Sequence, residues 1–200
     1  MDERSGRELR VTDERQRQRF MDVVIPHLDD AQSLARWLTG NAADAEDVVQ
    51  DAAIRALAGI GSLREGNPRA WLLTIVRNTA FTWLAKNRPK QLIVTDDDRV
   101  FEQAGLAMDE ALGTPTPEAA LIAKADAQCV TAAIAALPLP YREVIVLREI
   151  EELSYQEIAR VTSLPIGTVM SRLSRARVKL MAAIAADPAY RGQSVKAGRV

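Results

Sequence analysis

The sequence predicts an all-α fold with two small helical domains joined by a flexible linker, the C-terminal one a helix-turn-helix. The apolar content is 48%, but aromatic residues make up only 4%, and such a composition favours helices over β-sandwiches. Apolar residues recur at spacings of three and four, as on one face of a helix. A polar stretch with several glycines and prolines over residues 91–127 is longer than most loops within one compact domain, so it predicts an inter-domain linker.

Whole-chain properties exclude several classes of protein. The 200 residues can bury a sizeable core in one or two domains. A single cysteine, Cys129, and a single histidine, His27, exclude a disulfide framework and make a Cys/His metal site improbable. The chain has no apolar run of about 18 residues and no signal-peptide pattern. We therefore expect a cytoplasmic protein with no membrane insertion, no metal and no cofactor.

The N-terminal part divides into a leader and a helical domain. Residues 1–19 are charged or polar with almost nothing to bury, which predicts a disordered leader. From Phe20 the spacing becomes helical, and a first domain is expected over residues 20–90. Gly40 is expected to end one of its helices, because glycine adopts the left-handed conformation that commonly follows a helix.

An acidic helix is predicted over residues 43–57. Ala45, Val48, Val49, Ala52 and Leu57 would face inward, and an acidic face would be exposed. Three interpretations are open: a solvated helix whose acids suit the helix dipole, a docking face for a protein partner, or a divalent-metal site. The metal site would need a second carboxylate cluster on a facing helix, and none is seen in residues 20–90.

A long basic helix is predicted after Asn67-Pro68, because proline is tolerated in the first turn. Residues 67–95 contain no acid, and their arginines and lysines alternate with Trp71, Phe81 and Trp83. Basic and aromatic side chains together suit single-stranded nucleic acid, which needs phosphate neutralisation and surfaces for unstacked bases. For the tryptophans, packing in the core is the alternative.

A helix-turn-helix is predicted in a second domain over residues 128–183. Its first helix begins with a capping box, Ser154 with Glu157 three residues later, and ends before Pro165. Its second helix has an apolar stripe, and residues 165–181 contain no acid. A tight turn before a basic helix is typical of DNA-binding proteins that read the major groove. The alternative is a helical hairpin with a solvated basic face. Residues 184–200 are predicted to form a flexible tail.

Four stretches, in this order, resemble the extracytoplasmic-function sigma factors, the minimal group of the sigma-70 family of bacterial RNA polymerase subunits. They are Asp44-Ala45-Glu46-Asp47-Val48-Val49-Gln50, then Pro68-Arg69-Ala70-Trp71-Leu72 with Arg77-Asn78, then Leu137-Pro138 with Tyr141-Arg142-Glu143-Val144, and finally residues 153–180. The likeness covers about two-thirds of the chain.

The resemblance implies a role for each helical surface. The acidic helix is expected to dock on the core RNA polymerase through Asp44, Glu46, Asp47, Gln50 and Asp51. The basic helix is expected to capture the melted −10 promoter strand through Arg69, Trp71, Arg77, Asn78, Lys86 and Arg88. The second helix of the helix-turn-helix is expected to read the −35 duplex through Gly167, Thr168, Met170, Ser171, Arg172, Ser174, Arg175 and Lys179.

The family also implies partners. Core RNA polymerase, promoter DNA and an anti-sigma factor are expected, and the chain itself is expected not to be an enzyme. One alternative is a stand-alone helix-turn-helix regulator that binds duplex operator DNA without polymerase. A more distant alternative is an all-helical metal-dependent hydrolase that uses Asp44, Asp47 and Asp51.

Overall fold

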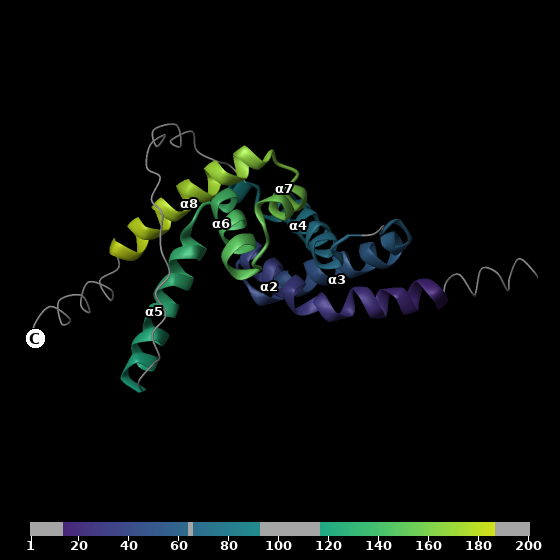
Figure 1. Ribbon diagram of the computed structural model, residues 1–200, viewed down its shortest axis with the longest axis horizontal. Helices are drawn as coiled ribbons and strands as arrows, with labels where there is room; N and C mark the ends of the chain where they lie inside the picture. The colour runs from purple at the N-terminus through teal and green to yellow at the C-terminus, as the bar shows by residue number, and fades with distance from the viewer. Residues whose placement is uncertain (1–13, 64–65, 93–116, 187–200) are drawn as a thin grey trace, which may run out of the picture.

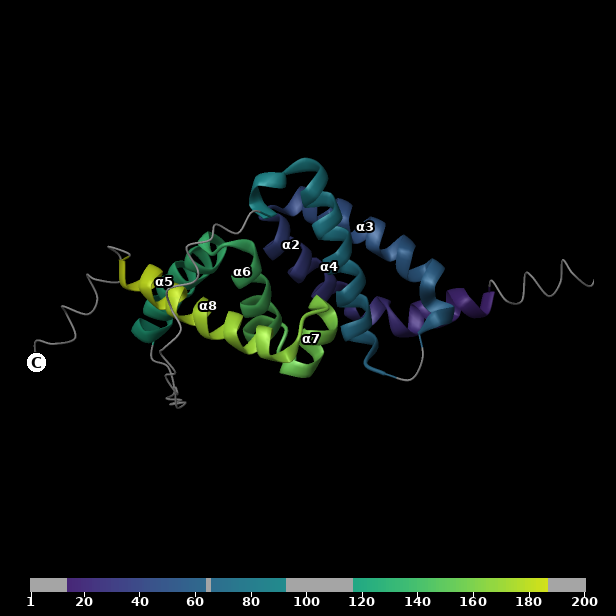
Figure 2. The same cartoon turned by 90° about the horizontal axis from the view of Figure 1, so that it is seen from above.

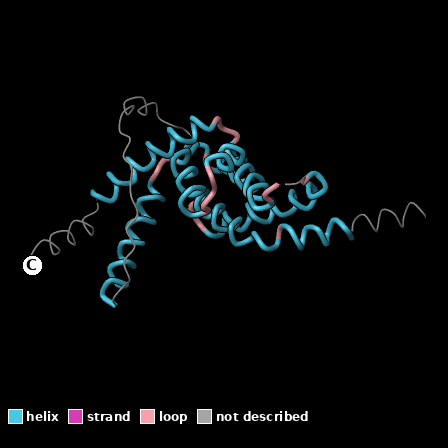
Figure 3. The backbone as a smooth tube through the Cα atoms, viewed as in Figure 1, coloured by secondary structure: helices cyan, strands magenta, loops and turns pink. Residues whose placement is uncertain are grey.

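The computed structural model describes residues 14–63, 66–92 and 117–186, and within these ranges the chain is helical, with no strand (Figure 3). The predicted all-α class is therefore confirmed. Two helical regions precede and follow residues 93–116, which lie outside the described residues. We refer to residues 14–92 as the N-terminal region and to residues 117–186 as the C-terminal region.

The N-terminal region contains three longer helices after a helix over residues 14–23. In order, its elements are η1 (Ile25–His27), α2 (Leu28–Thr39), α3 (Ala42–Gly59), η2 (Ile60–Ser62), α4 (Pro68–Asn87) and η3 (Pro89–Leu92). Figure 1 shows α4 lying against both α2 and α3.

Local sequence signals fix the ends of these helices. Gly40 ends α2 with φ +84°, as predicted, a conformation that costs glycine little because it has no Cβ. Asn41 then caps α3 by accepting a hydrogen bond from the backbone N–H of Asp44. Asn67 caps α4 in the same way, and Pro68 occupies the first turn. Caps of this kind satisfy backbone donors that the helix leaves without partners.

The C-terminal region contains the predicted helix-turn-helix. Its elements are α5 (Pro117–Ala136), α6 (Leu139–Ile145), the π-helical segment η5 (Val146–Ile150), α7 (Tyr155–Thr162) and α8 (Ile166–Ala186). The capping box is present at the start of α7, where Ser154 and Glu157 bond each other's backbone N–H groups. Ser163 adopts a left-handed conformation with φ +56° and turns the chain into α8.

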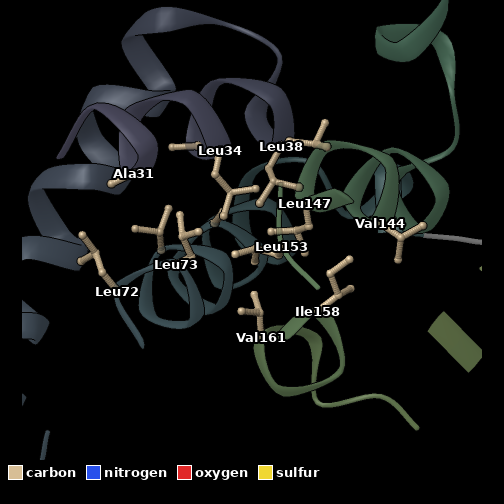
Figure 4. Close-up of a cluster of buried hydrophobic side chains, with 14 of the residues drawn as sticks. Ala31, Leu34, Leu38, Leu72, Leu73, Val144, Leu147, Leu153, Ile158 and Val161 are labelled. Atoms are coloured by element: carbon tan, nitrogen blue, oxygen red, sulfur yellow. The ribbon is translucent and has the colours of Figure 1, made fainter. Parts of the chain in front are cut away.

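One apolar core runs through both regions (Figure 4). Leu34 and Leu38 of α2 and Leu73 of α4 are buried in it, together with Leu147 of η5 and Leu153. Helix α7 packs against α4, and α6 and η5 reach α2 (Figure 2). The sequence predicted two domains joined by a linker but no contact between them, and here the two regions are docked on each other. Sequence periodicity cannot reveal this, because an inward-facing leucine looks the same whichever neighbour covers it.

Three details of the sequence prediction are wrong within the described residues. Residues 14–19 of the predicted disordered leader are helical, and residues 1–13 lie outside the described part of the chain. Residues 184–186 of the predicted tail are also helical, whereas the start of α5 at Pro117 agrees with the sequence, which predicts that helix resumes from about Glu118. Leu57, predicted to face inward on α3, is 39% exposed, and Ala56 is buried instead. Alanines carry most of the α3 contact surface, so the apolar stripe was hard to orient.

The capping box makes α7 a good site for a first stability test. Replacing Ser154 with alanine removes the acceptor for the Glu157 N–H and is expected to lower the free energy of unfolding by about 1 kcal/mol. Urea denaturation followed by circular dichroism measures the change. Ser174→Ala, on the exposed face of α8, is the matched control and should stay within about 0.5 kcal/mol of the wild type. Equal stability of Ser154→Ala and wild type would contradict the prediction.

Candidate nucleic-acid interface

The first turns of α8 present the small polar face that a major-groove reader needs. Val169, Leu173 and Ala176 are buried against the rest of the C-terminal region. On the other sides of the helix, the following predicted reading residues are exposed or half-buried: Gly167, Thr168, Met170, Ser171 and Ser174. A Cβ at Gly167 would meet nothing within 4 Å. The turn after Ser163 and the burial of one stripe therefore leave this face open to a ligand.

The basic residues of α8 lie in different surroundings. Arg172 and Arg175 are half-buried at the flanks of the helix, and the charge of Arg172 acts on the carboxylate of Glu143. Lys179 lies over the ring of Tyr141, with 5.4 Å between its Nζ and the ring centroid. Arg177, which the sequence did not select, pairs with Glu149 at 2.8 Å. The helix carries no acid of its own, so its surface is cationic.

A cleft of about 270 Å³ opens beside the start of α4. Trp71, half-buried, forms part of its wall and also lies 3.7 Å from the position that a Cβ on Gly59 would occupy. Arg160 reaches the cleft from α7. The full lining is Ser62, Leu63, Gly66, Asn67, Ala70, Trp71, Thr74 and Arg160. An aromatic wall with amide and hydroxyl groups is the chemistry that holds an unstacked base.

Two predicted DNA-binding arginines of α4 are engaged by carboxylates. Arg69 donates to Asp30 of α2 at 2.6 Å and to Glu151 of the C-terminal region at 2.6 Å. Arg77 donates from Nε to Glu143 at 2.6 Å, and its guanidinium lies 3.9 Å from the centroid of the Phe81 ring. Hydrogen bonding from Arg69 lowers the pKa of Asp30. Burial raises the pKa of Glu143 and of Glu151. This effect is larger than the lowering that the arginine partners cause.

The other predicted residues of α4 divide into exposed and anchored groups. Asn78 and Lys86 are exposed. Arg88 instead donates to the backbone carbonyl of Thr39 and to the carboxylate of Asp44. It thereby ties the end of α4 to the junction between α2 and α3.

The acidic face of α3 is similarly mixed. Glu46, Asp47, Gln50 and Asp51 are exposed, whereas Asp44 is half-buried and paired with Arg88. Asp51 pairs with Arg55 one turn later at 2.9 Å. Among the described residues, no hydrogen bond or ion pair engages the side chains of Glu46 and Asp47. These two carboxylates are therefore available to a partner without the loss of an internal contact.

Two further observations concern the alternatives. In residues 14–63, 66–92 and 117–186 no group of three or more histidine, cysteine or acidic side chains comes together in a way that could hold a metal ion. Asp44 and Asp51, two of the three aspartates in the hydrolase alternative, each pair with an arginine.

Among the described helices, none is long and apolar enough to cross a membrane.

Sequence reasoning missed Asp30, Glu143 and Glu151. Glu143 had a signal, since it directly precedes the apolar run from Val144 to Leu147, and an acid is seldom fully buried without a partner. Glu151 and Asp30 had none, because both lie among other charged residues in the sequence. Their roles depend on contacts between segments far apart in the chain.

Both regions of the chain match family models. Residues 23–90 match the family model for sigma-70 region 2, and residues 127–180 match that for sigma-70 region 4. The ECF RNA polymerase sigma factor SigW of Bacillus subtilis is 33% identical over 164 residues, which cover 80% of this chain and 86% of SigW. The ECF RNA polymerase sigma-E factor of Escherichia coli is 35% identical over 138 residues, or 67% of this chain and 70% of that protein.

Solved structures give the same result. The sigma factor RpoE of Bartonella quintana, in complex with the anti-sigma factor NepR, superposes with a TM-score of 0.61 at 30% identity. That match covers 84% of this chain and 98% of RpoE. CnrH, in complex with the cytosolic domain of CnrY, superposes with a TM-score of 0.55 at 27% identity over 84% of this chain and 88% of CnrH. From its matches to both sigma-70 regions and to these relatives over most of their length, this chain belongs to the ECF sigma factors of the sigma-70 family.

Proposed function

We propose that this chain directs core RNA polymerase to specific promoters, reads the −35 duplex with α8, captures the melted −10 strand with α4, and so initiates transcription. The helices over residues 20–90 act as the unit that binds polymerase and the −10 strand. Residues 128–183 act as the unit that binds the −35 duplex. The chain is a specificity subunit that works in the cytoplasm, and catalysis belongs to the polymerase.

The observation that carries this proposal is the open polar face on the first turns of α8. A buried stripe holds the helix in the domain, and Thr168, Ser171 and Ser174 remain accessible beside Arg172 and Arg175. Hydroxyl and guanidinium groups donate hydrogen bonds to base edges and phosphates in the major groove. The exposed Met170 offers an apolar surface of the kind that contacts thymine methyl groups.

The second DNA site is proposed at the start and along the exposed side of α4. The cleft beside Trp71 has the aromatic and polar lining that an unstacked base requires. Arg69 and Arg77 would neutralise the phosphates of the melted strand, and Asn78 and Lys86 are exposed nearby on the same helix. Arg88 is assigned a structural role instead, because both of its partners, Asp44 and Thr39, belong to the N-terminal region itself.

Regulation by an anti-sigma factor is proposed from the relatives. The solved structures of RpoE and CnrH contain the anti-sigma factor NepR and the cytosolic domain of CnrY, respectively. A similar partner would hold this chain away from polymerase until a signal releases it.

Run-off transcription with a bacterial core RNA polymerase on a promoter library tests the proposal. The wild-type chain should select a subset of promoters with shared −35 and −10 elements. Arg175→Ala is expected to weaken transcription from those promoters by about 1–3 kcal/mol, or roughly 5- to 150-fold, because one contact to the −35 element is lost. The ratio of transcript from promoters with an intact −35 element to transcript from promoters with a substituted −35 element should fall accordingly.

Arg177→Ala is the matched control, because it removes the same charge from the same helix but from a guanidinium that pairs with Glu149. This variant should retain the wild-type ratio. Equal −35 discrimination by Arg175→Ala and wild type would reject the assignment of Arg175. If the purified chain binds duplex operators tightly without polymerase and confers no start-site selection, a stand-alone regulator is the correct reading.

A further inference from the structure

The contacts between the two regions engage the same arginines that are proposed to hold the −10 strand. Arg69 donates to the Glu151 carboxylate and, at 2.5 Å, to the Glu151 backbone carbonyl. Arg77 donates to Glu143 at 2.6 Å. Both acids come from the C-terminal region, and both arginines come from α4. The ion pairs are therefore part of the surface that docks the two regions.

Burial makes these pairs incompatible with bound DNA. The side chains of Glu143 and Glu151 are 1% and 2% exposed, and those of Arg77 and Arg69 are 18% and 24% exposed. A guanidinium binds a carboxylate and a phosphate through the same planar fork of N–H donors. Glu151 engages both terminal nitrogens of Arg69, and Glu143 engages the Nε of Arg77. These N–H groups cannot donate to a phosphate while the two regions are docked. Arg160 of α7 also contributes to the cleft beside Trp71.

We infer that the carboxylates of Glu143 and Glu151 act as internal substitutes for promoter phosphates and compete with the −10 strand for Arg77 and Arg69. The chain would accordingly hold single-stranded DNA on α4 only when the C-terminal region has moved off that helix. This inference rests on the proposed role of α4 in −10 capture, and it assigns to that site an inhibitor within the same polypeptide.

The environment of the acids suits a contact that must be broken. Oε2 of Glu143 has no hydrogen-bond partner within the described part of the chain, and burial raises the pKa of this carboxyl group. Removing two charges from water costs free energy that their attraction only partly returns. The ion pairs therefore fix the geometry in which the two regions dock, but their small net stabilisation still allows the regions to separate.

The first experiment uses the full chain without polymerase. Binding of a fluorescein-labelled single-stranded oligonucleotide of mixed sequence is followed by fluorescence anisotropy. The double variant Glu143→Gln/Glu151→Gln keeps the side-chain shapes but removes both charges. It should bind about tenfold more tightly than wild type, because a larger fraction of the chains has α4 accessible. Adding Arg69→Ala and Arg77→Ala to this variant should abolish the gain.

The matched control removes the same charge from two exposed positions away from these arginines. Glu14 and Asp29 are both exposed, so Glu14→Gln/Asp29→Asn tests the general effect of lowering negative charge. The control should raise affinity less than twofold. If it raises affinity as much as the buried pair does, or if Glu143→Gln/Glu151→Gln folds and binds as wild type does, the inference is rejected.

Hydrogen exchange of the wild-type chain provides a measurement that needs no variant. Saturating oligonucleotide should speed amide exchange in α7 and in residues 151–154, because these segments leave α4 when DNA binds. Unchanged or slower exchange there, with the oligonucleotide bound, would overturn the inference.

A third measurement separates this inference from the function on which it rests. In the reconstituted holoenzyme, Arg69→Ala/Arg77→Ala should impair promoter melting at the −10 element. If melting is impaired but the glutamate variants leave oligonucleotide binding unchanged, the −10 role stands and the internal competition fails. If melting is normal, the −10 role of these arginines fails, and the inference fails with it.

Discussion

Asp47→Arg is expected to abolish co-purification with core RNA polymerase while leaving the helical fold unchanged. Asp47 is exposed near the middle of the α3 acidic face, and among the described residues its carboxylate has no ion-pair partner. The substitution therefore breaks no internal contact. It places a cation where the proposed polymerase surface accepts an anion, and like charges brought together at an interface cost several kcal/mol. The affinity should fall by about a hundredfold or more.

Pull-down with tagged core polymerase and a competition assay against wild-type chain measure this loss. Circular dichroism checks that the variant is folded. Asp29→Arg is the matched control, since Asp29 is exposed at the start of α2 rather than on α3. It should bind core polymerase nearly as well as wild type. Wild-type binding by Asp47→Arg would remove α3 from the docking surface.

Asp44 is a less suitable target for the same test, although the sequence placed it in the same set. Its carboxylate pairs with Arg88 and lies beside the Asn41 cap of α3. Substitution would disturb the junction of α2, α3 and α4 as well as any contact with polymerase. A loss of binding in an Asp44 variant would therefore not identify a contact residue.

Leu147→Ala is expected to have the largest effect on stability. Leu147 is fully buried in the core cluster of Figure 4, which also contains Leu38 of the N-terminal region. Replacing a buried leucine with alanine removes apolar contacts and leaves a cavity, with a typical cost of about 3–5 kcal/mol. Chemical denaturation should show a correspondingly lower free energy of unfolding.

The tryptophans make this experiment informative about the docked regions. All three, Trp37, Trp71 and Trp83, lie in the N-terminal region, so their fluorescence reports on that region alone. Because the core is continuous, Leu147→Ala should shift the fluorescence-detected transition as well as the one detected by circular dichroism. Leu57→Ala, at a 39% exposed position, is the control and should cost at most about 1 kcal/mol. An unchanged fluorescence transition in Leu147→Ala would show that the two regions unfold independently.

The local parts of this fold were predictable because the signals that specify them are local. The capping box at Ser154, the left-handed Gly40 and the turn before Pro165 each depend on a few neighbouring residues, and the structure contains all three. The stripes of α7 and α8 were also predictable, since isoleucine, valine and leucine are distinctive at helical spacing. The buried stripe of the alanine-rich α3 was harder to predict, and Leu57 was assigned to the wrong side of that helix.

The sequence also identified several candidate binding residues that are exposed in the structure. Asp47, Gln50, Asn78, Ser171 and Ser174 are exposed as a binding role requires. Their proposed roles still rest on the family resemblance and on the experiments above. Arg88 differs, because nothing in its neighbourhood along the chain indicates a tie to Asp44, a residue in another helix.

The sequence by itself determined the helices, their caps, the helix-turn-helix and the membership of the sigma-70 family, because these depend on the order and spacing of nearby residues. Only the tertiary structure decided that the two regions dock through one core and that Glu143 and Glu151 occupy Arg77 and Arg69. Those pairs join residues more than sixty positions apart. Charge attraction has no sequence period, so packing alone selects which acid meets which arginine.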